Sequence, residues 1–264
     1  MRSRVSTGKD VIKTSKRTPA PSSQGIAFDA SSPLPEGKDK QALVRSMFDS
    51  IAPRYDLVNF LMTFGLDAPW RRRTIELLRL SPASMVVDLG CGTGDLARSL
   101  RRGGNGAVGI DLSFGMLSAA RAGGAPLVQA DAVALPFRSA AMDAAVSGFA
   151  VRNFADLPAV LNELARVLRP GATLALLEVG EPQNALLRFG HRIWFTRVVP
   201  LLGAALSDAA AYRYLPRSVA YLPSFPEFVR LLNNAGFDEV THHGFSGSIA
   251  QCVTATRSAD RKEP

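Results

Sequence analysis

The 264-residue chain is predicted to fold as one α/β domain, with a mostly parallel sheet that helices cover on both faces. The hydrophobic share of 47% is ordinary for a globular protein. From residue 85 onward, short apolar runs alternate with amphipathic stretches, as in chains whose parallel strands are joined by helices. The first of these runs, Met85–Leu89, ends in glycines, which is typical of a buried strand that leads into a tight turn.

Two helices are expected before that strand. Apolar residues recur at helical spacing between Leu43 and Ile51, which predicts an amphipathic helix that ends before Pro53. A second helix is predicted over 70–80, between two prolines. The expected strands of the central part are 85–89, 107–110 (closed by Asp111), 126–129, 142–147 and 173–178, and the expected helices are 95–102, 116–121 and 157–168.

The alternation breaks after Gly180. Residues 188–206 form a mixed apolar and aromatic stretch with Trp194 and Phe195, which can be either a substrate lid or a covering helix. A helix over 226–235 and strands over 237–242 and 248–255 are expected to complete the domain.

The domain is expected to cover residues 38–257, between a disordered basic tail (1–37) and a short disordered tail (258–264). The net charge is +8, and much of it lies in the first seventeen residues. That segment is interpreted as a solvated tail, with lipid or nucleic-acid contact and organelle import as alternatives. No apolar run approaches the length that spans a bilayer. Two distant cysteines argue against a disulfide framework or a structural zinc site and favour a reducing compartment such as the cytoplasm.

The loop Asp88-Leu89-Gly90-Cys91-Gly92-Thr93-Gly94-Asp95 is the strongest chemical signal. Glycines after a strand permit a sharp turn and let a ligand approach the backbone. The spacing differs from the Gly-x-Gly-x-x-Gly of dinucleotide folds and favours S-adenosylmethionine. The Asp88 carboxylate is expected to interact with the cationic amino-acid end of that cofactor.

Two further acids follow the next two strands. Asp111 closes the second strand, where a carboxylate can accept hydrogen bonds from both ribose hydroxyls. Asp131 and Ala132 follow the third strand and are placed to meet the adenine edge. Taken singly, each residue can instead serve a turn or a helix cap, but their ordered spacing favours a cofactor site. No nucleotide triphosphate loop and no metal-binding cluster is recognised in the sequence.

Two stretches resemble the signatures of the ubiquinone/menaquinone biosynthesis C-methyltransferases. Val44–Asn59 (VRSMFDSIAPRYDLVN) is similar to the N-terminal signature, and Phe149–Asn153 (FAVRN) to the second signature, Phe-Gly-x-Arg-Asn. Leu177-Glu178, the segment 208–215 and Pro223 follow in the family's order, so the resemblance covers about residues 40–256.

The resemblance implies a seven-stranded sheet whose last strand is antiparallel, and methylation of a ring carbon of a polyprenylated quinol. Gly90, Gly92, Thr93, Asp111, Asp131 and Ala132 would then hold S-adenosylmethionine, and Tyr55, Arg152 and Asn153 would border the quinol ring. The guanidinium of Arg152 can stabilise a phenolate or organise a water that takes the proton. Asp56 or Asp67 is the expected proton acceptor, although each can instead serve a cap or a turn.

The chain departs from the family at three positions. Asp67 stands where many members have histidine, Ala150 replaces a glycine, and Gly148 stands where a serine is frequent. Asp67 slightly favours demethylmenaquinol over the ubiquinone precursor. His191, His242 and His243 lack catalytic spacing and are expected at the surface or in packing.

Alternative functions are methylation of another phenolic or lipid-like molecule, or a non-catalytic scaffold that binds S-adenosylmethionine within a quinone-synthesis complex. A nucleic-acid methyltransferase is disfavoured because no base pocket or RNA-binding module is recognised. A polyprenyl tail implies peripheral membrane contact, through either the basic tail or Trp194 and Phe195. A homodimer or a quinone-synthesis complex stays open.

Overall fold

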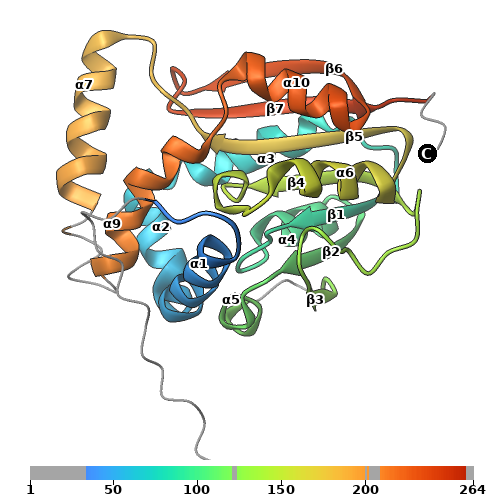
Figure 1. Cartoon of the computed structure of the whole chain (residues 1–264), viewed down its shortest axis with the longest axis horizontal. Coiled ribbons are helices and arrows are strands. Elements are labelled where there is room, and N and C mark those ends of the chain that lie inside the picture. Colours follow the sequence, from blue (N-terminus) through green and yellow to red (C-terminus); the bar gives the residue numbers. More distant parts are fainter. Residues whose placement is uncertain (1–33, 121–123, 200, 202–208, 260–264) are drawn as a thin grey trace, which may run out of the picture.

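A seven-stranded sheet runs through the centre of the molecule (Figure 1). The computed structural model describes residues 34–120, 124–199, 201 and 209–259. The strands lie in the order β3-β2-β1-β4-β5-β7-β6. Their bounds are β1 (Met85–Leu89), β2 (Gly106–Asp111), β3 (Leu127–Gln129), β4 (Met142–Gly148), β5 (Leu168–Val179), β6 (Phe237–Phe245) and β7 (Ala250–Arg257). β7 is antiparallel to both of its neighbours, which confirms the predicted sheet.

Helices cover both faces of the sheet and one of its ends. They are α1 (Gly37–Ile51), α2 (Tyr55–Thr63), α3 (Asp67–Leu77), α4 (Asp95–Arg102), α5 (Phe114–Ala119), α6 (Leu157–Val167), α7 (Ala185–Ile193), α9 (Ala209–Ser218) and α10 (Phe225–Ala235). α6 and α10 pack on one face and α3 and α4 on the other. The order of strands and helices follows the predicted α/β pattern.

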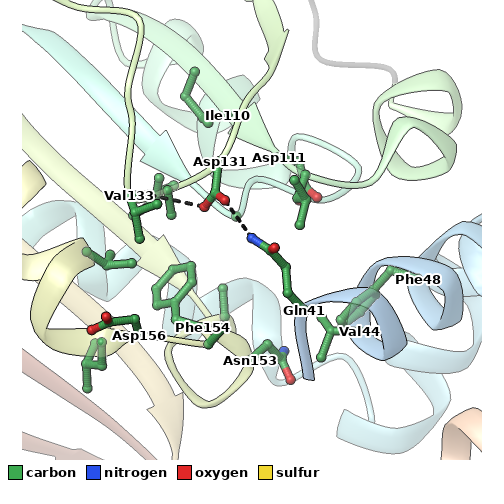
Figure 2. Close-up of a pocket in the computed structure, with 18 of the residues that line it drawn as sticks. Gln41, Val44, Phe48, Ile110, Asp111, Asp131, Val133, Asn153, Phe154 and Asp156 are labelled. Atoms are coloured by element: carbon green, nitrogen blue, oxygen red, sulfur yellow. Dashed lines mark hydrogen bonds between the residues drawn. The ribbon is translucent and has the colours of Figure 1, made fainter. Parts of the chain in front are cut away.

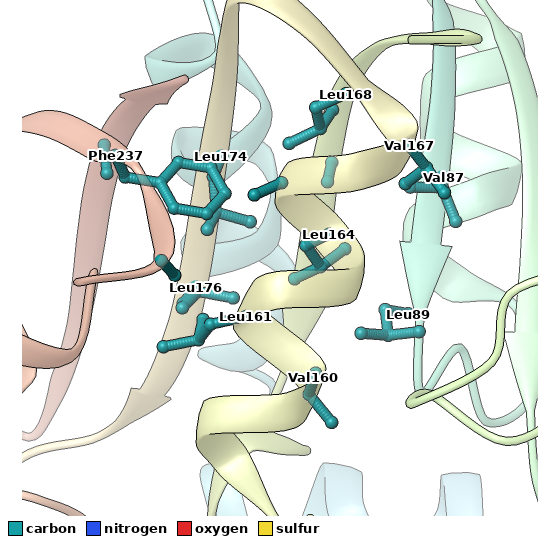
Figure 3. Packing of buried hydrophobic residues seen from close by; sticks show 14 of the residues in the cluster. Val87, Leu89, Val160, Leu161, Leu164, Val167, Leu168, Leu174, Leu176 and Phe237 are labelled. Carbon is teal, nitrogen blue, oxygen red and sulfur yellow. The ribbon is translucent and has the colours of Figure 1, made fainter. Parts of the chain in front are cut away.

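The apolar run of β1 is continuous because both of its faces are buried. Val87 and Leu89 pack against α6, as Figure 3 shows, in the larger core cluster. Val86, on the opposite face, packs with α3 and α4. Because successive side chains of a strand point to opposite faces, Asp88 shares the face of Val86 and points toward α4. This alternation decides the environment of Asp88.

A third, smaller core joins the helices that lie beyond the carboxyl ends of the strands. α1, α2 and α9 pack there around Val58, Val199 and Tyr214. The Asp49 carboxylate of α1 accepts hydrogen bonds from the Ser113 hydroxyl (2.6 Å) and the Gly115 N–H (2.8 Å) at the start of α5. Through these bonds α1 is fixed across the edge at which β1 and β2 end.

The helices near Pro53 and Pro69 differ from the predicted ones. α3 begins at Asp67, three residues before the expected start, because Pro69 lies in its first turn, where an N–H needs no partner. α2 follows a short turn at Ala52–Arg54 and was not predicted. Of the stretch 188–206, expected as a lid or a covering helix, the described part is helical, with α7 and the π-helical turn Trp194–Val198, while 200 and 202–206 lie outside the described residues. Of the expected tails, residues 1–33 and 260–264 lie outside the described residues, and Gly37 belongs to α1.

Candidate active site

Two cavities meet at the carboxyl ends of the parallel strands. Cavity 1, of about 630 Å³, lies over the ends of β1, β2 and β4 and is closed by α1 (Figure 2). Cavity 2, of about 560 Å³, lies between α2, α7 and the turn after β4. Phe48, Tyr55 and Phe149 line both cavities. The two cavities therefore adjoin at these three rings.

The glycine loop forms one wall of cavity 1. Gly90 and Gly92 both have positive φ, +64° and +54°, which a residue with a side chain rarely adopts. A Cβ on Gly90 would lie 2.5 Å from that of Ala150, so this position is closed by protein. A Cβ on Gly92 would meet nothing within 4 Å. Its backbone is thus open to a ligand, as predicted for a cofactor loop.

Asp111 lies opposite this loop at the end of β2 and lines cavity 1. Its two carboxylate oxygens accept hydrogen bonds from the N–H groups of Gly92 and Ser113, each at 2.8 Å. Burial raises the pKa of this carboxyl, and the same N–H bonds oppose the shift. The carboxylate therefore ties the glycine loop to β2 and faces the cavity, where the ribose hydroxyls were expected.

Asp131 and Ala132 also line cavity 1, at the end expected for adenine. One oxygen of Asp131 accepts from the Gln41 amide of α1 at 2.5 Å, and the other from the N–H of Val133 at 3.2 Å (Figure 2). Gln41 was not predicted. It comes from a helix about ninety residues away in the chain, and a glutamine on a helix carries no motif that would single it out. The Gln41–Asp131 contact closes α1 over the cavity.

Two of the predicted cofactor residues do not line either cavity. Asp88 is fully buried, and its Oδ2 accepts the N–H of Ala97 at 2.9 Å, which holds the start of α4, while its Oδ1 has no hydrogen-bond partner among the described residues. Burial raises its pKa to about 7. Thr93 donates its hydroxyl to the Asp56 carboxylate at 2.6 Å. Asp88 in β1 and Thr93 in the glycine loop thus contact the loop and its neighbours without lining cavity 1.

Cavity 2 is mostly apolar, and its cationic group is Arg152. The guanidinium is buried and ion-paired with Glu178, with Nη1 2.5 Å from Oε2. Its Nε donates to the Ser218 hydroxyl at 3.2 Å, and its backbone N–H donates to the other Glu178 oxygen. No described residue accepts a hydrogen bond from Nη2. A fixed cation with unused donors is thus available to an anionic oxygen.

Tyr55 and Asn153 stand near the junction of the cavities. Tyr55 lines both, and burial raises the pKa of its phenol, so the hydroxyl stays protonated and can donate. Asn153 lines cavity 1, and its amide donates to the Phe149 carbonyl while its oxygen faces the Tyr214 hydroxyl, both at 3.4 Å. The structure thus places Tyr55 at both cavities, Asn153 at cavity 1 and Arg152 at cavity 2.

Neither of the expected proton acceptors lines a cavity. The buried Asp67 carboxylate accepts from Asn59 (3.0 Å), Thr63 (2.9 Å) and Arg71 (2.5 Å), so its oxygens are occupied by donors of α2 and α3. Asp56 is exposed and accepts from Thr93. Asp67 thus ties α2 to α3 and lies outside both cavity linings, while its expected part in proton transfer stays a prediction.

His191 is a further residue of cavity 2 that the sequence analysis placed at the surface or in packing. Its ring lies 4.5 Å from that of Phe195, and its Nε2 is buried without a hydrogen-bond partner among the described residues. Burial lowers its pKa, so the ring is neutral near pH 7. Trp194 and Phe195 also line this cavity. The π-helical turn that carries them therefore acts as a wall of cavity 2.

The composition of cavity 1 fits S-adenosylmethionine. It offers the carboxylates of Asp111 and Asp131 to hydroxyl and amino groups, an open backbone at Gly92, and apolar walls. Within the described residues, no three His, Cys, Asp or Glu side chains gather as metal ligands would. Over the same residues, no helix combines the length and apolar character needed to cross a membrane.

Comparison with solved structures shows the fold. A methyltransferase from Thermotoga maritima, described as a possible histamine N-methyltransferase, superposes with a TM-score of 0.59 at 19% identity, over 81% of this chain and all of its own. The [4+2]-cyclase SpnF superposes with a TM-score of 0.62 at 16% identity, over 86% of this chain and 99% of its own. At such identities the likeness concerns architecture alone.

Sequence relatives are closer. The "Ubiquinone/menaquinone biosynthesis C-methyltransferase UbiE" of Syntrophotalea carbinolica is 40% identical over 81% of this chain and 94% of its own length. The "Demethylmenaquinone methyltransferase" of Thermus thermophilus is 44% identical over 72% of this chain and 91% of its own. Residues 36–257 match the model of the ubiE/COQ5 methyltransferase family. The chain therefore belongs to the ubiE/COQ5 methyltransferase family, which confirms the prediction of a methyltransferase that uses S-adenosylmethionine.

Proposed function

We propose that this C-methyltransferase of quinone biosynthesis places the methyl group on a ring carbon of a polyprenylated quinol, with demethylmenaquinol favoured. The observation that carries the proposal is the junction of the two cavities. Cavity 1 suits the cofactor, and cavity 2 presents apolar walls and one buried arginine to the acceptor. Several relatives bear the name demethylmenaquinone methyltransferase, which supports the choice of quinol.

The residues at the junction suit this chemistry. S-adenosylmethionine, when bound, supplies a methyl group on a cationic sulfur. A quinol ring becomes nucleophilic when a hydroxyl proton leaves and negative charge moves into the ring. Arg152 faces that charge with donors that Glu178 and Ser218 hold in place, which stabilises the phenolate in a water-poor site. Tyr55 can donate to a quinol oxygen and helps to align the ring.

The balance of the step requires a proton acceptor. The hydroxyl proton leaves first. The ring carbon then forms its bond to the methyl group as the bond to sulfur breaks, and when that carbon gives up its own proton the oxygen becomes a hydroxyl again, so that one proton is released in all. No carboxylate of the described chain lines cavity 2. We therefore assign the proton to a water held beside Arg152, and not to Asp67. A lipid-soluble acceptor also implies that the enzyme works at a membrane surface.

The test is methyl transfer from labelled S-adenosylmethionine to demethylmenaquinol and to the demethylated ubiquinol precursor, measured side by side with Arg152→Ala. Turnover of demethylmenaquinol that collapses in the variant is expected. Cofactor binding should persist in Arg152→Ala, because Arg152 does not line cavity 1, and this shows that the variant is folded. Tight cofactor binding without turnover of either quinol would contradict the proposal and leave another phenolic acceptor or a scaffold role.

A further inference from the structure

The mouth of cavity 2 is formed by apolar side chains that are themselves exposed. Among its lining residues, Phe64 at the end of α2 is 67% exposed and Leu186 in α7 is 80% exposed. Leu66 and Leu187, which also line the cavity, are each 39% exposed. A lining residue with this much exposure marks where a cavity opens. The opening therefore lies between the end of α2 and α7.

α7 also carries an outer apolar face, made of exposed side chains that do not line cavity 2. Phe189 and Ile193 are 64% and 37% exposed, lie one helical turn apart and do not line cavity 2. α7 has no buried residue, and Figure 1 shows it standing at the edge of the molecule, away from the sheet. A contiguous exposed apolar surface is unfavourable in water and marks a contact site. We call Phe64, Leu66, Leu186, Leu187, Phe189 and Ile193 the rim patch.

Charge identifies the partner of the rim patch. Between residues 182 and 199 the chain carries three arginines and no aspartate or glutamate. Arg188 lies 3.5 Å from Glu181, while no described carboxylate pairs with Arg192 or Arg197. Apolar side chains flanked by cations that no described carboxylate pairs with are the pattern of a helix that lies in the interface of an anionic bilayer. A protein partner would need acidic groups around an apolar groove, whereas an anionic lipid surface supplies both.

We propose that the rim patch docks into the surface of an anionic lipid bilayer, so that cavity 2 opens directly onto the lipid. The inference rests on the proposed function, because only a lipid-soluble acceptor requires such an opening. Trp194 does not take part in the docking. Its indole N–H donates to the Met62 carbonyl at 3.0 Å and its ring lies 4.5 Å from that of Phe64, so it supports the patch from behind. The outer face of α7 replaces Trp194 and Phe195 as the inserting element.

The test is co-sedimentation of the full chain with phosphatidylcholine vesicles, with and without phosphatidylglycerol, in the absence of quinol. Phe189→Gln combined with Ile193→Gln removes the outer face of α7 and leaves the cavity lining intact. Phe114→Gln is the matched control, since Phe114 is also 64% exposed but lies on α5, well apart from α7 in Figure 1. The wild type is expected to bind anionic vesicles, the double variant about tenfold more weakly, and the control unchanged. Arg192→Gln with Arg197→Gln should reduce binding only to the anionic vesicles.

Vesicle binding by these variants decides between α7 and the basic tail. If the double variant binds as well as the wild type, and deletion of residues 1–33 abolishes binding, the proposal is overturned in favour of the basic tail. An equal loss in Phe114→Gln would also overturn it. Methyl transfer to a short-tailed, water-soluble quinol separates the two proposals, because the double variant should retain it. If the wild type methylates no quinol but binds vesicles, and the double variant loses that binding, the docking surface is supported while the proposed acceptor fails.

Discussion

The Arg152 guanidinium and the Glu178 carboxylate form a buried ion pair, 2.5 Å apart, at the wall of cavity 2. Glu178 is the last but one residue of β5, and Arg152 belongs to the short helical turn after β4. Glu178 also accepts the backbone N–H groups of Arg152 and Val179. Because the carboxylate is held by the backbone of both neighbouring segments, the guanidinium has a fixed position before any substrate arrives.

Arg152→Lys is expected to lower kcat about 100-fold. A lysine keeps the charge but lacks the planar set of donors that reaches Glu178, Ser218 and a ligand together. The dissociation constant for S-adenosylmethionine should not change. Steady-state kinetics and calorimetric titration of the cofactor measure the two effects, with Ser218→Ala as a milder companion that removes one contact. A rise in KM at constant kcat would mean that Arg152 only binds the acceptor.

Asp88 predicts a pH dependence of stability. Burial raises its pKa from the ordinary 3.8 to about 7, so between these pH values the folded state holds a proton that the unfolded chain releases. Stability from this group is therefore greatest below about pH 4 and falls as pH rises to about 7, by about 4 kcal/mol. Asp88→Asn has no such proton. The difference between the free energies of unfolding of the wild type and of Asp88→Asn, measured in urea, should fall as pH rises across this window. A difference that does not change with pH would show that Asp88 is ionised in the folded state.

The fold could be predicted from the centre of the chain because its strands are buried on both faces. The run of β1 has Asp88 as its one polar residue and is followed by Gly90, and the run of β2 closes with Asp111. α2 could not be predicted in the same way. Of its side chains only Val58 is buried, while Leu57 and Phe60 are exposed, so its apolar pattern is not that of one core-facing stripe. Pro53, which lies in the short turn before α2, also gave the pattern of a helix end without showing that a new helix follows.

The site could be predicted where it depends on the ends of parallel strands. Asp111 and Asp131 follow β2 and β3, whose carboxyl ends meet at one edge. The side chains that reach the cavities from helices could not be predicted, since neither Gln41 nor His191 belongs to a recognisable sequence motif. The environment of Asp88 could not be predicted either. A strand residue next to the site can point to either face of the sheet, and the face toward α4 is known only from the packing.

Gln41→Ala is expected to raise the dissociation constant for S-adenosylmethionine about fivefold, mainly through faster release. The side chain joins α1 to Asp131 across the mouth of cavity 1, so its removal loosens the cover. Gln251→Ala is the matched control, since that amide also donates a hydrogen bond to a backbone carbonyl, that of Val179, and neither residue lines cavity 1. Stopped-flow displacement of the cofactor measures the release rate. If Gln41→Ala and Gln251→Ala release it equally fast, α1 does not retain the cofactor.

Gly92→Ala separates the two reasons for glycine in the loop. The residue has φ of +54° and an open cavity beside its Cα, so alanine there meets backbone strain and also fills space that the ligand needs. Gly104 has φ of +82°, equally open surroundings and no place in the cavity lining.

Both substitutions should destabilise the fold by about 1–2 kcal/mol, as thermal and urea unfolding will measure. Only Gly92→Ala should weaken S-adenosylmethionine binding, by tenfold or more, since its new methyl group points where the ligand approaches the backbone. Cofactor affinity that is equally unaffected in both variants would place the ligand away from the glycine loop. Equal weakening in both would instead mean that loss of stability, and not contact, controls binding.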